Sequence, residues 1–370
     1  MKNRSEAEKK YIEYELLKFS EQRKEFMKNP QLINLMWETT TRCNARCDHC
    51  AISCDNHQQV EEIDIKYVKK ALYDLAEKYD PSTIFFVATG GEPLLRKGLF
   101  EVMEYATSLG YQWGMSTNGS LLTKTMVKKL IDHKIESVNI SIDGLKERHE
   151  AFRKLPGYWD KIWDGIRMLQ EQGKGVVNII QISTCANKKN LGELDDIYKF
   201  LVDHNIQYWR ILGIQGEGRA AENSDILLDK DDYDYIFDFI ERKRAEHKIE
   251  QIVYGCSDYL GLNLENRVRN GYFICMPGTL VASILSNGDI FVCPNIPKRP
   301  ELIQGNIKVD NFADVWANRF QFFRDEHRQA SPECLACAHW KFCGGGALHS
   351  WDFDKHEQTW CMKDKISNFE

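Results

Sequence analysis

Three closely spaced cysteines near the start of the chain have a spacing suited to a metal centre. Cys43, Cys47 and Cys50 form the pattern C-x3-C-x2-C. An iron–sulfur cube needs four ligands, so three thiolates would hold it and leave one iron open to another molecule. Zinc is the alternative, because a zinc site prefers a fourth protein ligand, which Cys54 or His57 could supply. The spacing therefore predicts a metal or cluster site in this loop.

The other cysteines are also unevenly distributed. The chain has 12 cysteines, and seven of them fall within residues 256–365. Isolated cysteines are usually small buried hydrophobic residues, whereas clustered ones indicate metal or iron–sulfur ligation. A disulfide framework is not expected, because the chain shows no export signal. The C-terminal set reads Cys275-x12-Gly288-x4-Cys293, then Cys334-x2-Cys337-x5-Cys343, and finally Cys361.

Gly90, Gly91 and Glu92 form a second short motif, followed by a proline. Two glycines let the backbone approach a ligand closely, and a glutamate can accept a hydrogen bond from an ammonium group. Alone, this motif is more often a structural turn than a binding site. Its place at the end of the strand that follows the cysteine triplet favours a functional role.

Alternating strands and helices must position these motifs. Helical stretches at 64–79, 97–109, 123–133, 158–172 and 190–204 separate six strand-like runs. This order predicts a parallel sheet with right-handed crossovers, rolled into a partial α/β barrel. Chemistry in such folds lies at the carboxyl ends of the strands. The six runs are 34–39, 83–88, 111–117, 137–142, 176–183 and 207–214.

The predicted fold class is α/β, a partial (β/α)6 TIM-like barrel with a small cysteine-rich C-terminal domain. We expect a helical extension over 1–32, the barrel over 33–220, a helical linker over 221–255 and the cysteine-rich domain over 256–370. The last domain has short apolar runs, which indicates that metal organises it. The N-terminal helices are interpreted as packing on the body, with partner binding as the alternative.

Together, the cysteine triplet after the first strand and Gly-Gly-Glu-Pro after the second resemble the hallmarks of the radical S-adenosylmethionine (SAM) superfamily. The resemblance covers roughly residues 33–215. It implies that Cys43, Cys47 and Cys50 hold a [4Fe–4S] cluster whose open iron binds SAM. It also implies that one electron cleaves SAM to a 5′-deoxyadenosyl radical, which abstracts a hydrogen atom from the substrate. An external donor such as flavodoxin or ferredoxin would supply the electron.

The same resemblance implies SAM contacts at further strand ends. His49 stands where members usually place an aromatic residue near the adenine; the alternative is a loop histidine without a ligand. Arg153 resembles an arginine that meets the SAM carboxylate, a task that suits a guanidinium fork, and a solvated surface arginine is its alternative. The full expected set is His49, Gly90, Gly91, Glu92, Ser116, Asn118, Ser141, Asp143 and Arg153.

The C-terminal cysteines resemble the SPASM extension of radical SAM enzymes, which binds two auxiliary [4Fe–4S] clusters. The first cluster would lack a family ligand, because Ala347 stands at that position. We expect Cys256, Cys275 and Cys293 to hold it, with the fourth corner open or filled by His349. The alternative is that Cys256 is a buried thiol and this cluster is absent. The second cluster has a complete set, with a zinc ribbon as the alternative: Cys334, Cys337, Cys343 and Cys361.

Two residues are candidates for direct contact with the substrate. Cys185 ends the fifth expected strand and could return a hydrogen atom to a substrate radical; a buried thiol is the alternative. Arg210 interrupts the apolar sixth strand and could face the barrel lumen. An inward charge in a strand usually has a ligand or an ionic partner.

Composition excludes several classes of protein. The formal net charge is −6, which argues against nucleic acid as a main partner. Nothing approaches 18 uninterrupted apolar residues, so we expect no membrane span. The charged segment 1–10 has no apolar signal-peptide core, which predicts a cytoplasmic protein.

The substrate is predicted from the resemblance alone. SPASM members mostly modify peptides, so we expect an oxidoreductase that forms a crosslink or thioether, or epimerises a residue, in a ribosomally made peptide. The sulfatase-maturing branch is disfavoured, because Pro294 stands where those enzymes carry an aspartate. The alternative is a radical dehydrogenase or decarboxylase of a small molecule. A non-catalytic metal scaffold is disfavoured, since Gly90, Gly91 and Glu92 would have no purpose in it.

Overall fold

A curved ten-stranded sheet forms the centre of the computed structural model, which describes residues 3–52, 54, 61–272, 275–367 and 369. The strand order is β10-β9-β8-β1-β2-β3-β4-β5-β6-β7. All neighbours from β8 to β7 pair in parallel, whereas β9 pairs antiparallel with both β8 and β10. The strands are β1 (Asn34–Thr40), β2 (Phe85–Gly90), β3 (Gln112–Thr117), β4 (Ser137–Ser141), β5 (Ile179–Ala186), β6 (Tyr208–Gly213), β7 (Gln251–Tyr254), β8 (Val281–Ile284), β9 (Asp289–Phe291) and β10 (Gly305–Asn306).

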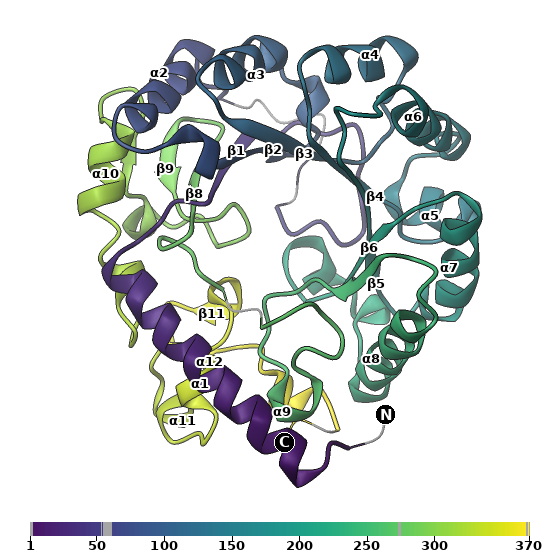
Figure 1. The fold of residues 1–370 in the computed structure, drawn as a ribbon, viewed down its shortest axis with the longest axis vertical. Helices are drawn as coiled ribbons and strands as arrows, with labels where there is room; N and C mark the ends of the chain where they lie inside the picture. The colour runs from purple at the N-terminus through teal and green to yellow at the C-terminus, as the bar shows by residue number, and fades with distance from the viewer. Residues whose placement is uncertain (1–2, 53, 55–60, 273–274, 368, 370) are drawn as a thin grey trace.

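Seven helices between the parallel strands line the outer face of this sheet (Figure 1). Their buried residues recur every three or four positions, as at Val68, Leu72 and Leu75 of the second helix, so each helix packs one apolar stripe on the sheet. The predicted α/β fold is therefore confirmed. The helices are α2 (Ile65–Ala76), α3 (Leu99–Ser108), α4 (Lys124–Asp132), α5 (Lys146–Arg153), α6 (Trp159–Gln172), α7 (Leu194–Asp203) and α8 (Lys230–Ala245).

The sheet contains two parallel strands beyond the six that the sequence predicted for the barrel, β7 and β8. β7 pairs with β6 and lies in the segment 221–255, which was expected to be a helical linker and which also contains α8. β7 was missed because its sequence has three apolar residues in succession and no alternation, although its burial does alternate.

The cysteine-rich region continues the barrel sheet. β8 pairs in parallel with β1, from Asn34 opposite Val281 to Trp37 opposite Ile284. β9 and β10 then extend the sheet edge. The remaining elements are short: α9 (Gly261–Leu264), α10 (Phe312–Asn318), α11 (Pro332–Leu335), α12 (Trp340–Cys343), β11 (Trp351–Asp352) and β12 (Glu357–Gln358).

The N-terminal helix α1 (Glu6–Lys28) packs against this C-terminal region (Figure 1). Ser5 caps it in a capping box with Glu8. Its buried face contains Ile12, Leu16 and Arg23. The structure thus agrees with the interpretation of a helix that packs on the body.

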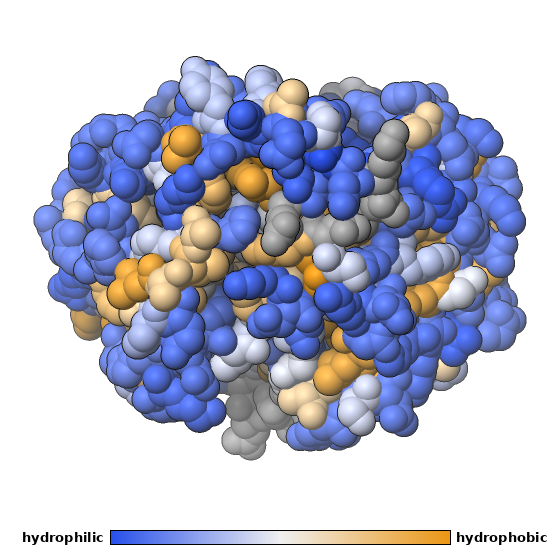
Figure 2. All heavy atoms as spheres, turned by 90° about the horizontal axis from the view of Figure 1, so that it is seen from below, coloured by the Kyte–Doolittle hydropathy of each residue, from blue (hydrophilic) through white to orange (hydrophobic). Residues whose placement is uncertain are grey.

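The face shown in Figure 2 is largely hydrophilic, with apolar residues gathered in small groups. Within the described ranges, no helix is both long and apolar enough to span a membrane.

Candidate functional site

A cavity of about 460 Å³ opens at the carboxyl ends of the parallel strands. This volume is within the range of small-molecule sites. Residues from the cysteine loop and from the ends of β2 to β7 form its walls, together with residues of the C-terminal region. It therefore joins the two groups of cysteines that the sequence singled out: Cys43, Cys47 and Cys50 on one wall, and Cys256, Cys275 and Cys293 on another.

The cysteine loop is held from several sides. The Asp48 amide donates to the Phe152 carbonyl at 3.0 Å, at the end of α5. Arg219, which follows β6, donates from Nε to the Cys47 carbonyl at 2.7 Å and from Nη1 to the Cys54 carbonyl at 3.2 Å. These bonds hold the three thiols at the mouth of the barrel.

Gly90 and Gly91 pack directly against the start of this loop. The Gly91 amide donates to the Thr40 carbonyl at 2.8 Å, and the Glu92 amide donates to the Arg42 carbonyl at 2.9 Å. A Cβ atom at Gly91 would lie 2.1 Å from the Arg42 carbonyl oxygen. Both glycines line the cavity, and the close approach of two backbones requires their lack of a side chain.

Glu92 lies behind the cavity wall. It is fully buried, and its carboxylate accepts hydrogen bonds from the Thr117 hydroxyl at 2.8 Å and the Asn118 amide at 2.9 Å. Burial raises the pKa of this carboxyl, although the donors around it act in the opposite direction. The side chain fixes the end of β3, and its contact with the SAM ammonium stays a prediction.

Arg153 and Asp143 form a buried ion pair beside the cysteine loop. Arg153 Nε donates to Asp143 Oδ2 at 2.6 Å, and its Nη1 lies 3.8 Å from Cys47 Sγ. Burial acts to raise the pKa of Asp143, but Arg153, the two nearby histidines and the Cys185 amide together outweigh it, and the pKa is lowered. The interpretation of Arg153 as a solvated surface residue is therefore wrong, because it is 8% exposed.

His49, Asn118 and Ser116 also line the cavity. The His49 ring stacks on Phe152 with a centroid distance of 4.7 Å and an interplanar angle of 7°. Burial lowers the pKa of His49 to about 4, and its Nδ1 has no hydrogen-bond partner among the described residues. Asn118 Nδ2 donates to Asn44 Oδ1 at 2.9 Å. The unpaired His49 Nδ1 and the thiols of the cysteine loop fit an iron–sulfur cluster with a polar ligand bound beside it.

The two substrate-contact candidates also line the cavity. Cys185 lies at the end of β5, and its amide donates to Asp143 Oδ1 at 2.7 Å, so it shares this carboxylate with Arg153. Arg210, in the neighbouring β6, donates from Nη2 to the Gly255 carbonyl at 2.6 Å. Among the described residues no carboxylate forms an ion pair with Arg210. Ser141 lines the cavity at the end of β4, next to β5.

Cys275 and Cys293 act electrostatically on one another, whereas Cys256 has other neighbours. The Cys256 thiol donates to the Gly213 carbonyl at 3.7 Å. His349 Nε2 lies 2.7 Å from Gln215 Oε1, so this nitrogen already has a partner. All three cysteines line the cavity, but their joint role as ligands of a first auxiliary cluster stays a prediction.

The complete C-terminal set lies in the lobe under α1. Besides burial, Cys361 and Cys334 act to raise the pKa of Cys343, and Cys334 and Cys337 act to raise that of Cys361, whereas the joint role of the four thiols as ligands of a second auxiliary cluster stays a prediction. Across the described ranges, no three His, Cys, Asp or Glu side chains are grouped as the ligands of a single metal ion.

Comparison with known families decides the identity of the chain. The model of the Radical SAM superfamily matches residues 37–201, and that of the SPASM iron–sulfur cluster-binding domain matches residues 275–338. This is a radical SAM enzyme with a SPASM domain. The two domains imply SAM and iron–sulfur clusters as cofactors.

Relatives of this radical SAM enzyme are named for different functions. It is 27% identical over 332 residues to an AdoMet-dependent heme synthase of Methanosarcina barkeri, covering 85% of this chain and 90% of the relative. It is also 27% identical over 321 residues to the mycofactocin maturase MftC of Mycobacterium tuberculosis, covering 85% and 78%. These relatives establish the chemistry of the family and leave the substrate open.

Solved structures share the fold. The structure of anSMEcpe with bound AdoMet superposes with a TM-score of 0.68 at 19% identity, covering 91% of this chain and 93% of the other. Streptococcus suis SuiB bound to S-adenosylmethionine gives a TM-score of 0.65 at 19% identity, covering 86% and 73%.

Sequence reasoning missed Glu217 and Arg219 in the loop after β6. Both line the cavity of this radical SAM enzyme. Their signal was the segment Gly216–Arg219 shortly after the sixth strand, in which the acid lies between two glycines and the base follows the second glycine. Burial, followed by the nearby Asp258, raises the pKa of Glu217 to about 7.

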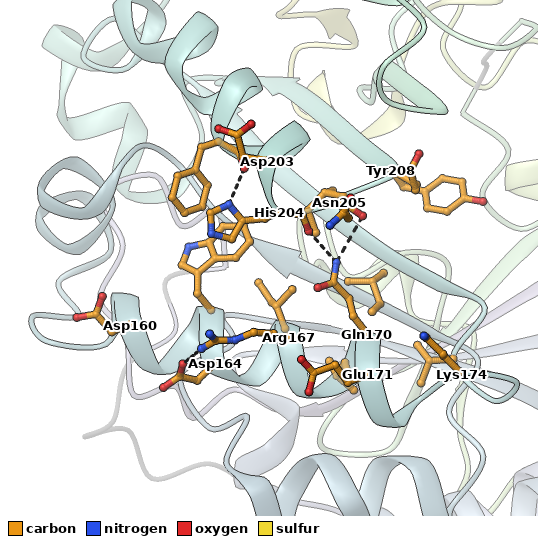
Figure 3. Close-up of a pocket in the computed structure, with 18 of the residues that line it drawn as sticks. Asp160, Asp164, Arg167, Gln170, Glu171, Lys174, Asp203, His204, Asn205 and Tyr208 are labelled. Atoms are coloured by element: carbon orange, nitrogen blue, oxygen red, sulfur yellow. Dashed lines mark hydrogen bonds and ion pairs between the residues drawn. The ribbon is translucent and has the colours of Figure 1, made fainter.

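A second hollow, of about 880 Å³, lies on the outside of the barrel between α6 and α7 (Figure 3). Arg167 pairs there with Asp164, and Gln170 donates to the His204 carbonyl at 2.9 Å. No cysteine and none of the predicted site residues line this hollow. It therefore does not belong to the radical SAM site.

Proposed function

We propose that this radical SAM enzyme abstracts a hydrogen atom from a carboxylate-bearing substrate that Arg210 holds in the cavity. A single observation carries the proposal: Arg210 lies in the cavity wall without a carboxylate partner in the described part of the chain. A buried cation without a counter-charge is costly, and a bidentate carboxylate is the usual partner of a guanidinium.

Three buried arginines of the protein have a carboxylate partner, which the partly buried Arg210 lacks among the described residues. Arg96 pairs with Glu62, Arg153 with Asp143, and Arg269 with Glu265. Arg210 instead donates to a backbone carbonyl, and burial lowers its pKa. The cavity therefore contains a cationic group that has no carboxylate partner in the part of the chain that the structure describes.

We assign the remaining wall residues to two roles. His49, Asn118 and Arg153 stand beside the cysteine loop and would contact bound SAM. Cys185 and Arg210 stand on the wall formed by β5 and β6, where the substrate would lie. When bound, SAM and its cluster supply the radical, and the auxiliary clusters exchange an electron with the substrate side. We infer two auxiliary clusters, one with a complete cysteine set, and a flavodoxin or ferredoxin as the donor.

A ribosomally made peptide is the first substrate class, because MftC is a maturase and SuiB was solved with its precursor peptide SuiA. A peptide offers a carboxylate at its C-terminus or on an acidic side chain. An iron tetrapyrrole with propionate groups is the second class. It is favoured by heme synthases that match 84–85% of this chain. The carboxylate is common to both.

The test uses the anaerobically reconstituted enzyme with SAM and dithionite, and measures 5′-deoxyadenosine and products by mass spectrometry. Iron-coproporphyrin III and acidic peptides serve as the two substrate probes. Replacing Cys43, Cys47 and Cys50 with alanine should abolish 5′-deoxyadenosine. If the intact enzyme also makes none, radical SAM activity is refuted.

Arg210→Gln should raise KM for the accepted probe about tenfold to a hundredfold, since a charge-assisted hydrogen bond contributes about 1.5–3 kcal/mol. Arg167→Gln in the outer hollow removes the same charge and is the matched control. Equal KM values in the two variants would overturn the assignment of Arg210.

A further inference from the structure

Two arginines each contact one of the two auxiliary cysteine sets. Arg23 extends from α1 and is 7% exposed; its Nη1 donates to the Cys343 carbonyl at 3.2 Å. Arg328 is partly buried, and its Nη2 donates to the Cys275 carbonyl at 3.2 Å. Each guanidinium therefore lies next to a cysteine of a different set. Besides burial, the charge of Arg23 acts to lower the pKa of Arg328.

Neither arginine forms an ion pair with a carboxylate within the described ranges. Glu326 influences Arg23, but it is exposed and lies 3.7 Å from Lys24, and Asp325, which influences Arg328, is also exposed. A cation removed from water destabilises a fold unless an anion lies near it.

Each arginine also has a hydrogen-bond donor to spare. The Nε atoms of Arg23 and Arg328 are both buried and have no partner among the described residues. A cube ligated by thiolates carries a net negative charge, and its sulfurs accept hydrogen bonds. The unpaired charges and the orphaned N–H groups thus fit the auxiliary clusters.

We propose that Arg23 and Arg328 are positioning residues that neutralise the auxiliary clusters and raise their reduction potentials. The proposal rests on the auxiliary clusters of the proposed function. Hydrogen bonds to the sulfurs and nearby positive charge stabilise the reduced, more negative form of a cluster. Arg23 lies closest to the set Cys334, Cys337, Cys343 and Cys361, and Arg328 to the set of Cys275 and Cys293.

The test is a potentiometric titration of the reconstituted full chain, followed by electron paramagnetic resonance, with iron analysis of every sample. Arg23→Gln should shift one auxiliary midpoint potential to more negative values, and Arg328→Gln should shift the other. Arg23→Lys keeps the charge and should recover most of the shift. Lys24→Gln removes one charge from the exposed side of α1 and should leave both potentials unchanged.

The outcomes separate the two proposals. Arg23→Gln with full iron and an unshifted potential overturns the role of Arg23. Loss of one cluster in Arg23→Gln but not in Arg23→Lys supports charge neutralisation by Arg23. Equal loss in both variants shows that Arg23 acts through packing and overturns the proposed charge neutralisation. A wild-type chain with only one cluster's iron refutes the auxiliary clusters and this inference with them, while 5′-deoxyadenosine formation would still support the radical SAM assignment.

Discussion

Arg153 and Asp143 meet through a hydrogen bond of 2.6 Å, with neither side chain more than 10% exposed and the free end of the guanidinium facing the Cys47 thiol. The pair links α5 to the end of β4. It therefore joins the stability of the barrel to the place where SAM would bind.

Arg153→Gln should lower the free energy of unfolding by about 3–5 kcal/mol, because it leaves Asp143 buried and unpaired. The double variant Asp143→Asn, Arg153→Gln removes both charges and should recover most of that loss in urea unfolding. SAM affinity, measured by calorimetry, should stay about tenfold to a hundredfold weaker in both variants. Normal SAM affinity in the double variant would leave Arg153 with a purely structural role.

Gly91→Ala should destabilise the protein by about 1–3 kcal/mol, because the added Cβ would meet the Arg42 carbonyl oxygen at 2.1 Å. The cysteine loop must shift to relieve this contact, so iron bound at Cys43, Cys47 and Cys50 should also fall. Gly192→Ala is the matched control, since nothing lies within 4 Å of its added Cβ. If denaturation gives the same stability for both variants, the close approach of the two backbones is not required.

Glu217→Gln should stabilise the protein at pH 8 and have little effect at pH 4. The pKa of this carboxyl rises from 4.5 to about 7 on folding, so the folded state favours its protonated form. The protonated carboxyl therefore adds nothing unfavourable to folding below pH 4.5, and the free energy of unfolding falls as the pH rises from 4.5 through 7 and the buried group becomes charged. The gain at pH 8 should be about 1–3 kcal/mol, from denaturation curves at both pH values. A pH-independent difference would contradict the raised pKa.

Iron analysis should give about twelve irons per chain if three cubes are present, and about eight if the first auxiliary cluster is absent. Replacing Cys334, Cys337, Cys343 and Cys361 with alanine should remove about four. Cys256→Ala should remove about four more if this thiol is a ligand. Full iron in Cys256→Ala would show that its bond to Gly213 is its only role.

Cys185 should return a hydrogen atom to the substrate radical if the reaction is a redox-neutral epimerisation. Its side chain lines the cavity in which we propose that the substrate binds. Product formed in heavy water should then contain one solvent deuterium, as read by mass spectrometry, and Cys185→Ala should abolish that label. A product two mass units lighter without label would indicate oxidation and leave Cys185 structural.

Much of the fold could be predicted because each long element has its own hydrophobic period. The strands from β1 to β6 alternate with helices whose apolar residues recur at helical spacing, and the loop motifs follow directly from the strand ends. β7 could not be predicted, because its four residues do not alternate between polar and apolar side chains. The pairing of β8 with β1 is a contact between distant segments, and nothing local in either strand specifies it.

The site was predictable in its residue types and less so in their contacts. The sequence located the thiols and the glycines, since their spacing is local. It could not show that Glu92 is buried behind the wall or that Arg153 has an acidic partner, because both facts depend on packing. The sequence did not single out Arg23 as a buried residue, since a single arginine in an amphipathic helix resembles any exposed charge.

The contact between α1 and the C-terminal lobe also has a consequence for how the chain is made. The Ser20 hydroxyl donates to the Lys341 carbonyl at 2.7 Å, although the two residues are 321 positions apart. The ribosome makes α1 before the barrel, whereas α9 and α12, against which α1 packs, follow the barrel in the chain. The contact with α12 cannot form until residues 340–343 have been made. The docking of α1 on the lobe around Cys343 is therefore a late step of folding.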